Sequence, residues 1–473
     1  MKYISTRGGA PPVSFSEMLL AGLAPDGGLY LPQAYPQISK AAIAGFAGRP
    51  YADVAQSILA PFLPGEAGQA AFQSMVEAAY ARFRHRAVAP LTQLDSGLFV
   101  LELFHGPTLA FKDLAMQLLA RFIDHVLRER GERATIIGAT SGDTGAAAIE
   151  AFQGLPQVEV FILYPHGRVS DVQRRQMTAA EAENIHTIAL EGTFDDAQAC
   201  VKNMFNNKEL RDELRLIGIN SINLARILFQ TVYYFTAAVA LGSPHRKVSF
   251  AVPTGNFGDI FAGWMAKRMG LPIDRLVIAT NSNDILARAL ATGRYAVQGV
   301  FPTQSPSMDI QVSSNFERLL FEAMGRDAAA LCGLMKSLGD KRAFSIPAEP
   351  LRAIQEEFDA YSISETGTTQ EIAVCFQQTG YLADPHTAVG LGAARKAMAV
   401  SQSRSPMIVL GTAHPSKFPE AIARAAGAAP SLPAHLAGLH ERKERFSILP
   451  NCQSSIEKFI RARAARALRR VAL

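Results

Sequence analysis

Residues 105–113, with the sequence HGPTLAFKD, place a single lysine, Lys112, between an apolar stretch and a strongly helical one. From Leu114 to Leu127 apolar residues recur every three or four positions, which is the spacing of one helix face. Lys112 is therefore expected at the start of a helix and at least partly buried. Burial disfavours the ammonium form, and a lysine whose pKa is lowered in this way can attack a carbonyl and hold a Schiff base. The spacing alone, however, is more typical of an ordinary lysine with its charge in water.

Two further segments combine a strand, a loop of small residues and a helix. Residues 139–145 (ATSGDTG) follow a strand expected at 133–138, and residues 253–259 (PTGNFGD) follow one expected at 248–252. Such a loop directs backbone N–H groups and the positive end of a helix toward one point, which suits a phosphate or a carboxylate. Either loop could instead be an ordinary tight turn whose aspartate caps the helix, so each is weak evidence alone.

A possible anion site lies at residues 220–226 (NSINLAR), which open a long apolar helix. Arg226 follows Ser221 by five positions, so the two side chains can join in one pocket, and arginine binds phosphate with two parallel hydrogen bonds. The alternative, which the spacing alone favours, is a helix capped by Asn220 or Ser221 with Arg226 in a surface salt bridge.

Taken together, these segments resemble the threonine synthases, a family of pyridoxal-phosphate enzymes of fold type II, the tryptophan synthase β fold. Residues 5–8 (STRG) and 22–30 (GLAPDGGLY) look like the N-terminal signature of that family, and residues 411–418 (GTAHPSKF) look like its late motif. Residues 384–387 (DPHT) also resemble a family segment, expected near the rim of the active site without an assigned step. The resemblance extends over nearly the whole chain.

The resemblance implies a cofactor, a substrate and a set of site residues. Lys112 would be the catalytic residue and would hold pyridoxal 5'-phosphate, the 255–259 loop would hold the cofactor phosphate, and Thr412 would face the pyridine nitrogen. The implied cofactor-binding residues are Lys112, Gly255, Asn256, Phe257, Gly258, Asp259 and Thr412. The implied substrate-binding residues are Thr140, Ser141, Asp143, Thr144, Ser221 and Arg226. They would grip O-phospho-L-homoserine, which the enzyme would convert with water to L-threonine and phosphate by γ-elimination and β-hydration, the last step of threonine biosynthesis.

Three other functions stay open at this point. A related phospho-lyase would release 2-oxobutanoate instead of adding water, as the threonine-synthase-like proteins of vertebrates indicate for this scaffold. A non-catalytic nucleotide- or phosphate-binding module could use the glycine loops, although no G-K-[S/T] follows either of them to bind phosphates and Mg²⁺. The third is a regulatory protein on the same scaffold that binds no cofactor.

Regular alternation of strands and helices from about residue 97 to 425 indicates parallel sheets covered by helices on both faces, the α/β class. The expected strands are 98–102, 135–138, 158–164, 185–190, 248–252, 276–280 and 407–411. Residues 1–95 are expected to be mostly helical, 87–97 to be a linker, and 96–430 to form the catalytic body. The resemblance implies a small domain inserted at about 113–245. Residues 426–450 are expected to be a connecting loop within a C-terminal region that spans 431–473.

Composition is typical of a cytoplasmic enzyme. The 473 residues suffice for two or three domains, no apolar run reaches membrane-spanning length, and the first residues lack a signal-peptide pattern. Four cysteines, with no CxxC pair, indicate neither a metal site nor a disulfide framework. The net charge of +5 originates in residues 456–473, which carry six basic residues and one acidic residue. We expect an amphipathic helix there, no nucleic-acid or membrane partner, and a monomer or homodimer.

Overall fold

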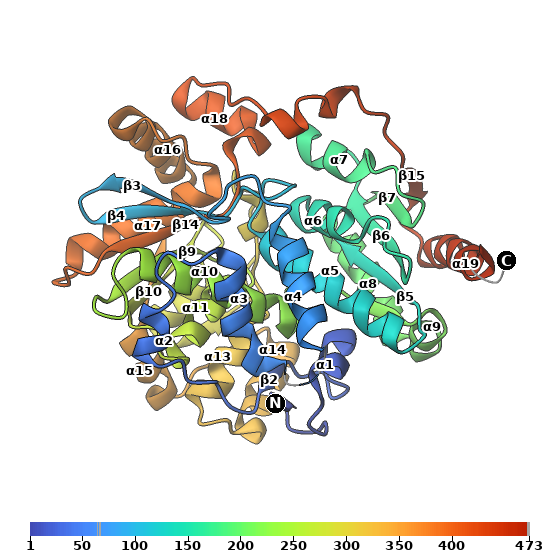
Figure 1. Cartoon of the computed structure of the whole chain (residues 1–473), viewed down its shortest axis with the longest axis horizontal. Coiled ribbons are helices and arrows are strands. Elements are labelled where there is room, and N and C mark those ends of the chain that lie inside the picture. Colours follow the sequence, from blue (N-terminus) through green and yellow to red (C-terminus); the bar gives the residue numbers. More distant parts are fainter. Residues whose placement is uncertain (64, 66–67, 471–473) are drawn as a thin grey trace.

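The computed structural model describes residues 1–63, 65 and 68–470, and in 465–470 it describes the backbone alone. Two sheets dominate it (Figure 1). The larger, six-stranded sheet has the order β13 (Phe358–Ser362), β10 (Ile273–Thr280), β9 (Val248–Pro253), β14 (Met407–Gly411), β4 (Leu98–Glu102) and β3 (Leu91–Asp95). The smaller, five-stranded sheet has the order β15 (Ser447–Pro450), β7 (Ile185–Glu191), β6 (Val158–Pro165), β5 (Ala134–Ala139) and β8 (Leu216–Gly218).

The six-stranded sheet is buried on both faces because helices cover both, and successive residues of each strand therefore pack in different clusters. In β10, Val277 and Ala279 pack in one cluster with α16 and α17, whereas Leu276 and Ile278 face the main core. Helices of this half of the molecule are α10 (Leu224–Ala240), α11 (Gly258–Arg268), α12 (Ile285–Thr292), α13 (Phe316–Ala323), α14 (Ala328–Lys341), α15 (Ala348–Glu357), α16 (Glu365–Thr379), α17 (Pro385–Val400) and α18 (Pro419–Ala426). All neighbouring strands are parallel except β3 and β4.

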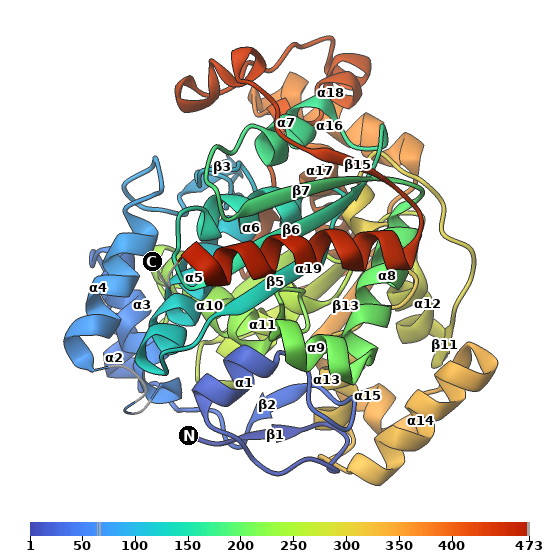
Figure 2. The same cartoon turned by 90° about the vertical axis from the view of Figure 1, so that its right-hand side faces the viewer.

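The five-stranded sheet is entirely parallel and is likewise covered on both faces. Its helices are α5 (Lys112–Glu129), α6 (Asp143–Phe152), α7 (Asp171–Thr178), α8 (Phe194–Asn206), α9 (Lys208–Leu214) and α19 (Gln453–Arg470). Figure 2 shows α19 lying across this sheet, where Ile456 and Ile460 are fully buried against Phe161 and Leu163. The amphipathic terminal helix is therefore present. The side chains of Ala467 and Leu468, and Val471 altogether, lie outside the described residues.

The N-terminal region is mostly helical, with α1 (Phe15–Ala21), α2 (Lys40–Ala44), α3 (Tyr51–Leu59) and α4 (Gln69–Tyr80). It also contains an antiparallel pair, β1 (Tyr3–Ser5) and β2 (Tyr30–Pro32). A second small pair joins β11 (Arg294–Ala296) and β12 (Ala343–Ser345). No helix of the described residues is long and apolar enough to cross a membrane.

The edges of both sheets differ from the sequence-based expectation: β8 and β13 are not among the expected strands, and two segments expected to be a linker and a loop contain strands. Residues 87–97 are not merely a linker, because β3 lies within them and pairs antiparallel to β4 with an irregularity between Gln93 and Asp95. Residues 426–450 are not merely a loop, because β15 extends the edge of the five-stranded sheet beside β7. Both strands are short, partly exposed edge strands, so neither carries the continuous apolar run of a central parallel strand.

Candidate active site

One cleft of about 1720 Å³ lies where the carboxyl ends of parallel strands from both sheets meet. In open α/β folds ligands bind at such strand ends. All of the residues expected from the sequence to bind cofactor or substrate line this cleft. They come from the start of α5, the loop after β5 with the start of α6, the loop after β9 with the start of α11, the segment before α10 with its first turn, and the residue after β14.

Lys112 is the first residue of α5 and is 9% exposed, as its helical context predicted. Its Nζ lies 3.3 Å from Oδ2 of Asp143 and 4.6 Å from the centre of the Phe111 ring. Burial lowers the pKa of Lys112, and the nearby cations Lys417 and Arg226 lower it further, against the opposing effect of Asp143. A lysine in these surroundings loses its proton more readily than one in water.

Local contacts fix the backbone that carries Lys112. Asp113 turns back on the preceding loop and accepts hydrogen bonds from the Thr108 backbone N–H, at 2.8 Å, and from its hydroxyl, at 2.7 Å. Gly106 makes this possible, since a Cβ there would lie 2.5 Å from an Asp113 carboxylate oxygen. The Phe111 N–H donates to the carbonyl of Thr412 at 2.8 Å, which joins the α5 start to the end of β14. The whole 105–113 motif thus serves to position one amine.

The loop after β5 forms a tight turn at the start of α6. The Thr140 hydroxyl oxygen accepts the backbone N–H groups of Gly142 and Gly145, both at 2.9 Å. The turn is not capped by its aspartate: the Asp143 side chain points to Lys112, Lys417 and neighbouring polar groups. Thr140, Ser141 and Thr144 all line the cleft. Their hydroxyls and the start of α6 offer hydrogen-bond donors to an anion.

The loop after β9 brings backbone close to a facing loop. A Cβ on Gly255 would lie 2.9 Å from the carbonyl oxygen of Ser307, and Phe257 adopts a left-handed conformation with φ 64° directly before α11. The side chain of Ser313 donates to the Gly255 carbonyl at 2.7 Å, and the Asn315 amide donates to the Asn256 carbonyl at 2.8 Å. Because the Gly255 and Asn256 carbonyls accept these hydrogen bonds, they point away from the cleft. The first N–H groups of α11 have no partner within the helix and remain directed at the cleft.

Asp259 ends this loop, but its carboxyl group is held by two tyrosines of α10. Oδ1 accepts hydrogen bonds from the hydroxyls of Tyr233 and Tyr234, whereas buried Oδ2 has no partner among the described residues. Burial raises the pKa of Asp259 to about 6, although both tyrosines oppose the shift. Here too the aspartate does not cap its helix.

Arg226 is buried, with 3% exposed, and not in the surface salt bridge that spacing favoured. Its Nη1 donates to the carbonyl of Ile219 at 3.0 Å, its Nε has no partner, and no carboxylate pairs with it in the described part of the chain. Burial lowers the pKa of Arg226 to about 10. The helix cap is Asn223, rather than Asn220 or Ser221, because the Asn223 side chain accepts the Ala225 N–H at 3.1 Å. Ser221 is thus left at the cleft.

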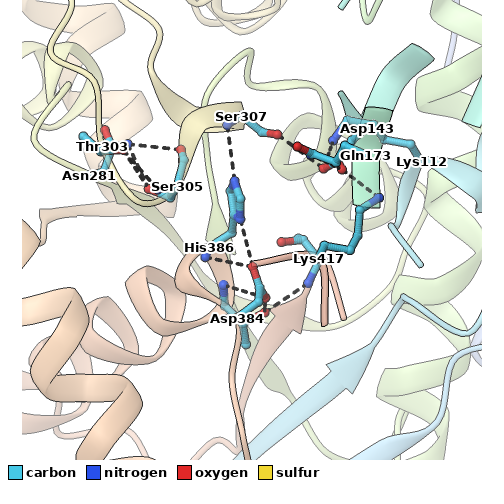
Figure 3. Close-up of polar contacts among 12 residues, drawn as sticks. Lys112, Asp143, Gln173, Asn281, Thr303, Ser305, Ser307, Asp384, His386 and Lys417 are labelled. Atoms are coloured by element: carbon cyan, nitrogen blue, oxygen red, sulfur yellow. Dashed lines mark hydrogen bonds and ion pairs between the residues drawn. The ribbon is translucent and has the colours of Figure 1, made fainter. Parts of the chain in front are cut away.

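Sequence reasoning missed the polar groups that join these segments (Figure 3). Lys417 pairs with Asp143 at 2.8 Å, Gln173 donates to Asp143 at 2.9 Å, and the Ser307 hydroxyl lies 3.3 Å from it. His386 also lines the cleft: its Nδ1 bonds Asp384 at 2.8 Å, and its Nε2 accepts the Ser307 backbone N–H at 3.3 Å. For Lys417 and His386, the only signal in the sequence was their place in the two family-like segments.

The residues present fit pyridoxal phosphate. A buried lysine with a lowered pKa can condense with its aldehyde, and the glycine-lined start of α11 can hold its phosphate. Thr412, 5% exposed, presents a hydroxyl that can hydrogen-bond an unprotonated pyridine nitrogen. The unpaired Arg226 guanidinium offers a place for a second anionic group.

Comparisons with known proteins agree with this geometry. Three family models match: the threonine synthase N terminus over residues 2–80, the pyridoxal-phosphate dependent enzymes over 84–331, and the threonine synthase C-terminal model over 387–460. The middle match covers more than half of the chain and defines a pyridoxal-phosphate-dependent enzyme, here of fold type II.

Individual relatives narrow the class. Over 462 residues, the chain is 52% identical to the threonine synthase of Pseudomonas aeruginosa, covering 97% of this chain and 98% of that protein. The PLP-bound threonine synthase from Brucella melitensis superposes with a TM-score of 0.95 at 57% identity, over 98% of this chain and 99% of that one. Human threonine synthase-like 2 is 35% identical over 456 residues, covering 95% and 94% of the two chains.

The chain belongs to the threonine synthase family. Its cofactor is pyridoxal phosphate, and its activity is that of a threonine synthase, a lyase of amino-acid biosynthesis that acts on a small molecule. The resemblance seen in the sequence, the α/β fold and the cofactor are thereby confirmed.

Proposed function

We propose that the chain converts O-phospho-L-homoserine and water to L-threonine and inorganic phosphate in the cleft described above. The observation that carries this proposal is Arg226, a buried guanidinium in the same cleft as Lys112 with no carboxylate partner among the described residues. A buried charge without a counterion is costly, so such a residue is kept where a ligand supplies the opposite charge. The leaving phosphate of the substrate is such a ligand.

Lys112 is proposed to hold the cofactor and then to act on the substrate as a base. When bound, pyridoxal phosphate supplies an aldehyde that condenses with amines and an aromatic ring that withdraws electrons from the substrate carbon. Because burial lowers the pKa of Lys112, its Nζ loses a proton more readily than that of a lysine in water, and as a neutral amine it can take a proton from Cα and return one there. Gly255, Asn256, Phe257, Gly258 and Asp259 are proposed to hold the cofactor phosphate, and Thr412 its ring nitrogen.

The substrate phosphate is proposed to lie against Arg226 and Ser221, with the hydroxyls of Thr140, Ser141 and Thr144 as further donors. These groups would hold the γ-phosphate as it leaves, which disperses the charge that develops on its oxygen atoms. Asp143 is not proposed to contact the phosphate directly, because a carboxylate repels an anion. Its oxygens already accept from Lys417, Gln173, Ser307 and Lys112.

Three further assignments complete the proposal. A cytoplasmic location suits a charged phosphate ester, which does not cross a lipid bilayer unaided. A monomer or a homodimer is compatible with the site, since all its residues come from one chain. A small domain at about 113–245 is supported by the five-stranded sheet, whose strands β5 to β8 fall between residues 134 and 218.

The decisive test is product analysis of the purified protein with O-phospho-L-homoserine. The expected result is L-threonine and phosphate in equal amounts. Phosphate together with 2-oxobutanoate would mean elimination without hydration and would overturn the proposal. Human threonine synthase-like 2 is a more distant relative than the Pseudomonas enzyme, which favours threonine as the product.

A further inference from the structure

A second lysine, Lys417, is buried more completely than Lys112. It ends the short 3-10 turn Pro415–Lys417 and is 0% exposed. Its Nζ lies 2.8 Å from Oδ1 of Asp143 and donates to the carbonyl oxygen of Thr108 at 2.8 Å. Thr108 belongs to the loop that carries Lys112. Lys417 therefore contacts both the loop and the carboxylate that face the proposed cofactor lysine.

Asp143 connects the two lysines through its two oxygens (Figure 3). Oδ1 accepts from Lys417 and from Gln173 at 2.9 Å, and Oδ2 faces Lys112 at 3.3 Å and the hydroxyl of Ser307 at 3.3 Å. The contact to Lys417 is the shorter of the two ion pairs. Asp143 is thus primarily the counterion of Lys417 and only secondarily that of Lys112.

The charge balance of this cluster favours a neutral Lys112. With both lysines protonated, one carboxylate faces two buried cations and the cluster carries an excess positive charge. When Lys112 loses its proton, Asp143 and Lys417 remain as a balanced pair. Without Lys417, the same carboxylate would pair with Lys112 alone and would keep its ammonium charged.

We propose that Lys417 is a positioning residue that acts as the permanent counterion of Asp143, so that the Nζ of Lys112 is released as a neutral amine to bind the cofactor and to move protons. This inference rests on the proposed role of Lys112 as the cofactor lysine. Lys417 itself contacts neither Lys112 nor the proposed position of the substrate phosphate, and it acts through Asp143.

The electrostatics of the neighbouring groups agree. Burial by itself raises the pKa of Asp143, yet Lys417 and Lys112 hold it well below its usual range. The other charged or titratable groups that face the cluster are Arg226, which lowers the pKa of Lys112, Asp113 and His414 on the side of Lys417, and Asp259 and His386 across the cleft. Because the Ser307 N–H points at Nε2 of His386, the Nδ1–H of that ring is directed to Asp384 and not to the lysines.

The effect of the Lys417 charge on the pKa of Lys112 can be worked out from the distance between the two ammonium groups. Ammonium groups on the two oxygens of one carboxylate lie roughly 6 Å apart, and unit charges at that distance interact by about two pKa units at an effective dielectric constant of ~20. Removing the charge of Lys417 should therefore raise the pH at which Lys112 becomes reactive by about two units. At neutral pH this corresponds to a loss of reactivity of roughly 100-fold.

The experiment measures how fast the full chain, stripped of cofactor, takes up pyridoxal phosphate at pH 6 to 10. Uptake is followed by visible absorbance, and borohydride reduction with peptide mass spectrometry locates the modified lysine. The quantity compared is the pH at which uptake reaches half of its maximal rate. Lys417→Met removes the charge and should raise this midpoint by about two pH units, whereas Lys417→Arg, which keeps the charge, should leave it within about half a pH unit. Lys396→Met, at an exposed lysine that donates to the Ser362 carbonyl, is the matched control and should shift nothing.

A second pair of variants keeps the test decisive if Lys417→Met does not fold. Lys417→Gln also removes the charge, and Asp143→Asn should shift the midpoint in the opposite direction, since both lysines then lack their anion. An unchanged midpoint in a folded charge-neutral variant would show that Lys417 only fills space and would overturn the inference. Labelling of a lysine other than Lys112 in the unaltered chain would instead overturn the proposed function.

Discussion

Replacing Arg226 by leucine should lower activity and at the same time preserve or increase stability. A guanidinium that binds a phosphate through two charge-assisted hydrogen bonds contributes about 1.5–3 kcal/mol for each bond. Losing both would raise the barrier by about 3–6 kcal/mol, so kcat/KM for O-phospho-L-homoserine should fall by roughly 10²- to 10⁴-fold. Cofactor binding should persist, because Arg226 is not part of the 255–259 loop.

The expected gain in stability follows from the surroundings of Arg226 in the folded chain. The substitution removes a buried cation, whose Nε has no partner, and loses one hydrogen bond to the Ile219 carbonyl. The lost bond costs about 1 kcal/mol, while burying a charge without a counterion costs several. The free energy of unfolding of the cofactor-free protein should therefore stay level or rise by about 1–3 kcal/mol.

The control is Arg318→Leu, at another buried arginine. Arg318 is 0% exposed, but its guanidinium donates to the carbonyls of Tyr30 and Ile222 and to the side chain of Asn315. Its replacement leaves two backbone carbonyls and one side-chain amide oxygen without their donor, whereas Arg226→Leu leaves only one, so it should destabilise the protein by about 3–5 kcal/mol. Initial rates of phosphate release and urea unfolding curves measure both quantities. Near-native kcat/KM in Arg226→Leu, or a loss of stability as large as in Arg318→Leu, would assign Arg226 to the structure rather than to the substrate.

Two other variants test the cleft. Lys112→Ala should abolish turnover yet retain pyridoxal phosphate through the α11 loop, so the gel-filtered protein should absorb visible light but resist labelling by borohydride. Residual activity above that of an inactive blank would disprove the role of Lys112. Lys396→Ala is the control. Asp259→Asn tests a pH dependence. Because burial raises the folded pKa of Asp259 to about 6, above the usual value of 3.8, its contribution to stability is complete below about pH 4 and is lost as pH rises through 6. The unaltered cofactor-free protein should lose about 3 kcal/mol relative to Asp259→Asn between pH 4 and 8, measured by urea unfolding, and a constant difference would mean that Asp259 stays ionised throughout.

The strands at the centre of both sheets could be predicted from the sequence because their signal is local. The expected segments 158–164 and 407–411 match β6 and β14 to within a residue, since central parallel strands are continuous apolar runs bounded by turns. β3 and β15 were missed because edge strands lack such runs and acquire their structure from a distant partner. The residues lining the cleft were assigned by the resemblance to the threonine synthases, and each of them lies beside a strand end or a helix start.

The pairing of side chains within the cleft could not be predicted, because it depends on which loops meet in three dimensions. The sequence-based alternatives treated Asp143 and Asp259 as helix caps and Arg226 as a surface residue. In the structure Asp143 is engaged by two lysines, and Asp259 is held by two tyrosines. Spacing along the chain contains no information on such contacts.

These pairings explain why Arg226 stays without a counterion in a cleft that contains two buried carboxyl groups. The carboxylate of Asp143 is committed to Lys417 and Lys112, and burial raises the pKa of Asp259 toward neutrality while Tyr233 and Tyr234 hold it in place. Neither carboxyl group can turn to Arg226 without leaving its own donors unsatisfied. The network that releases the amine of Lys112 therefore also leaves the Arg226 guanidinium free to bind an anion. Both features depend on the pairing of Asp143 with Lys417.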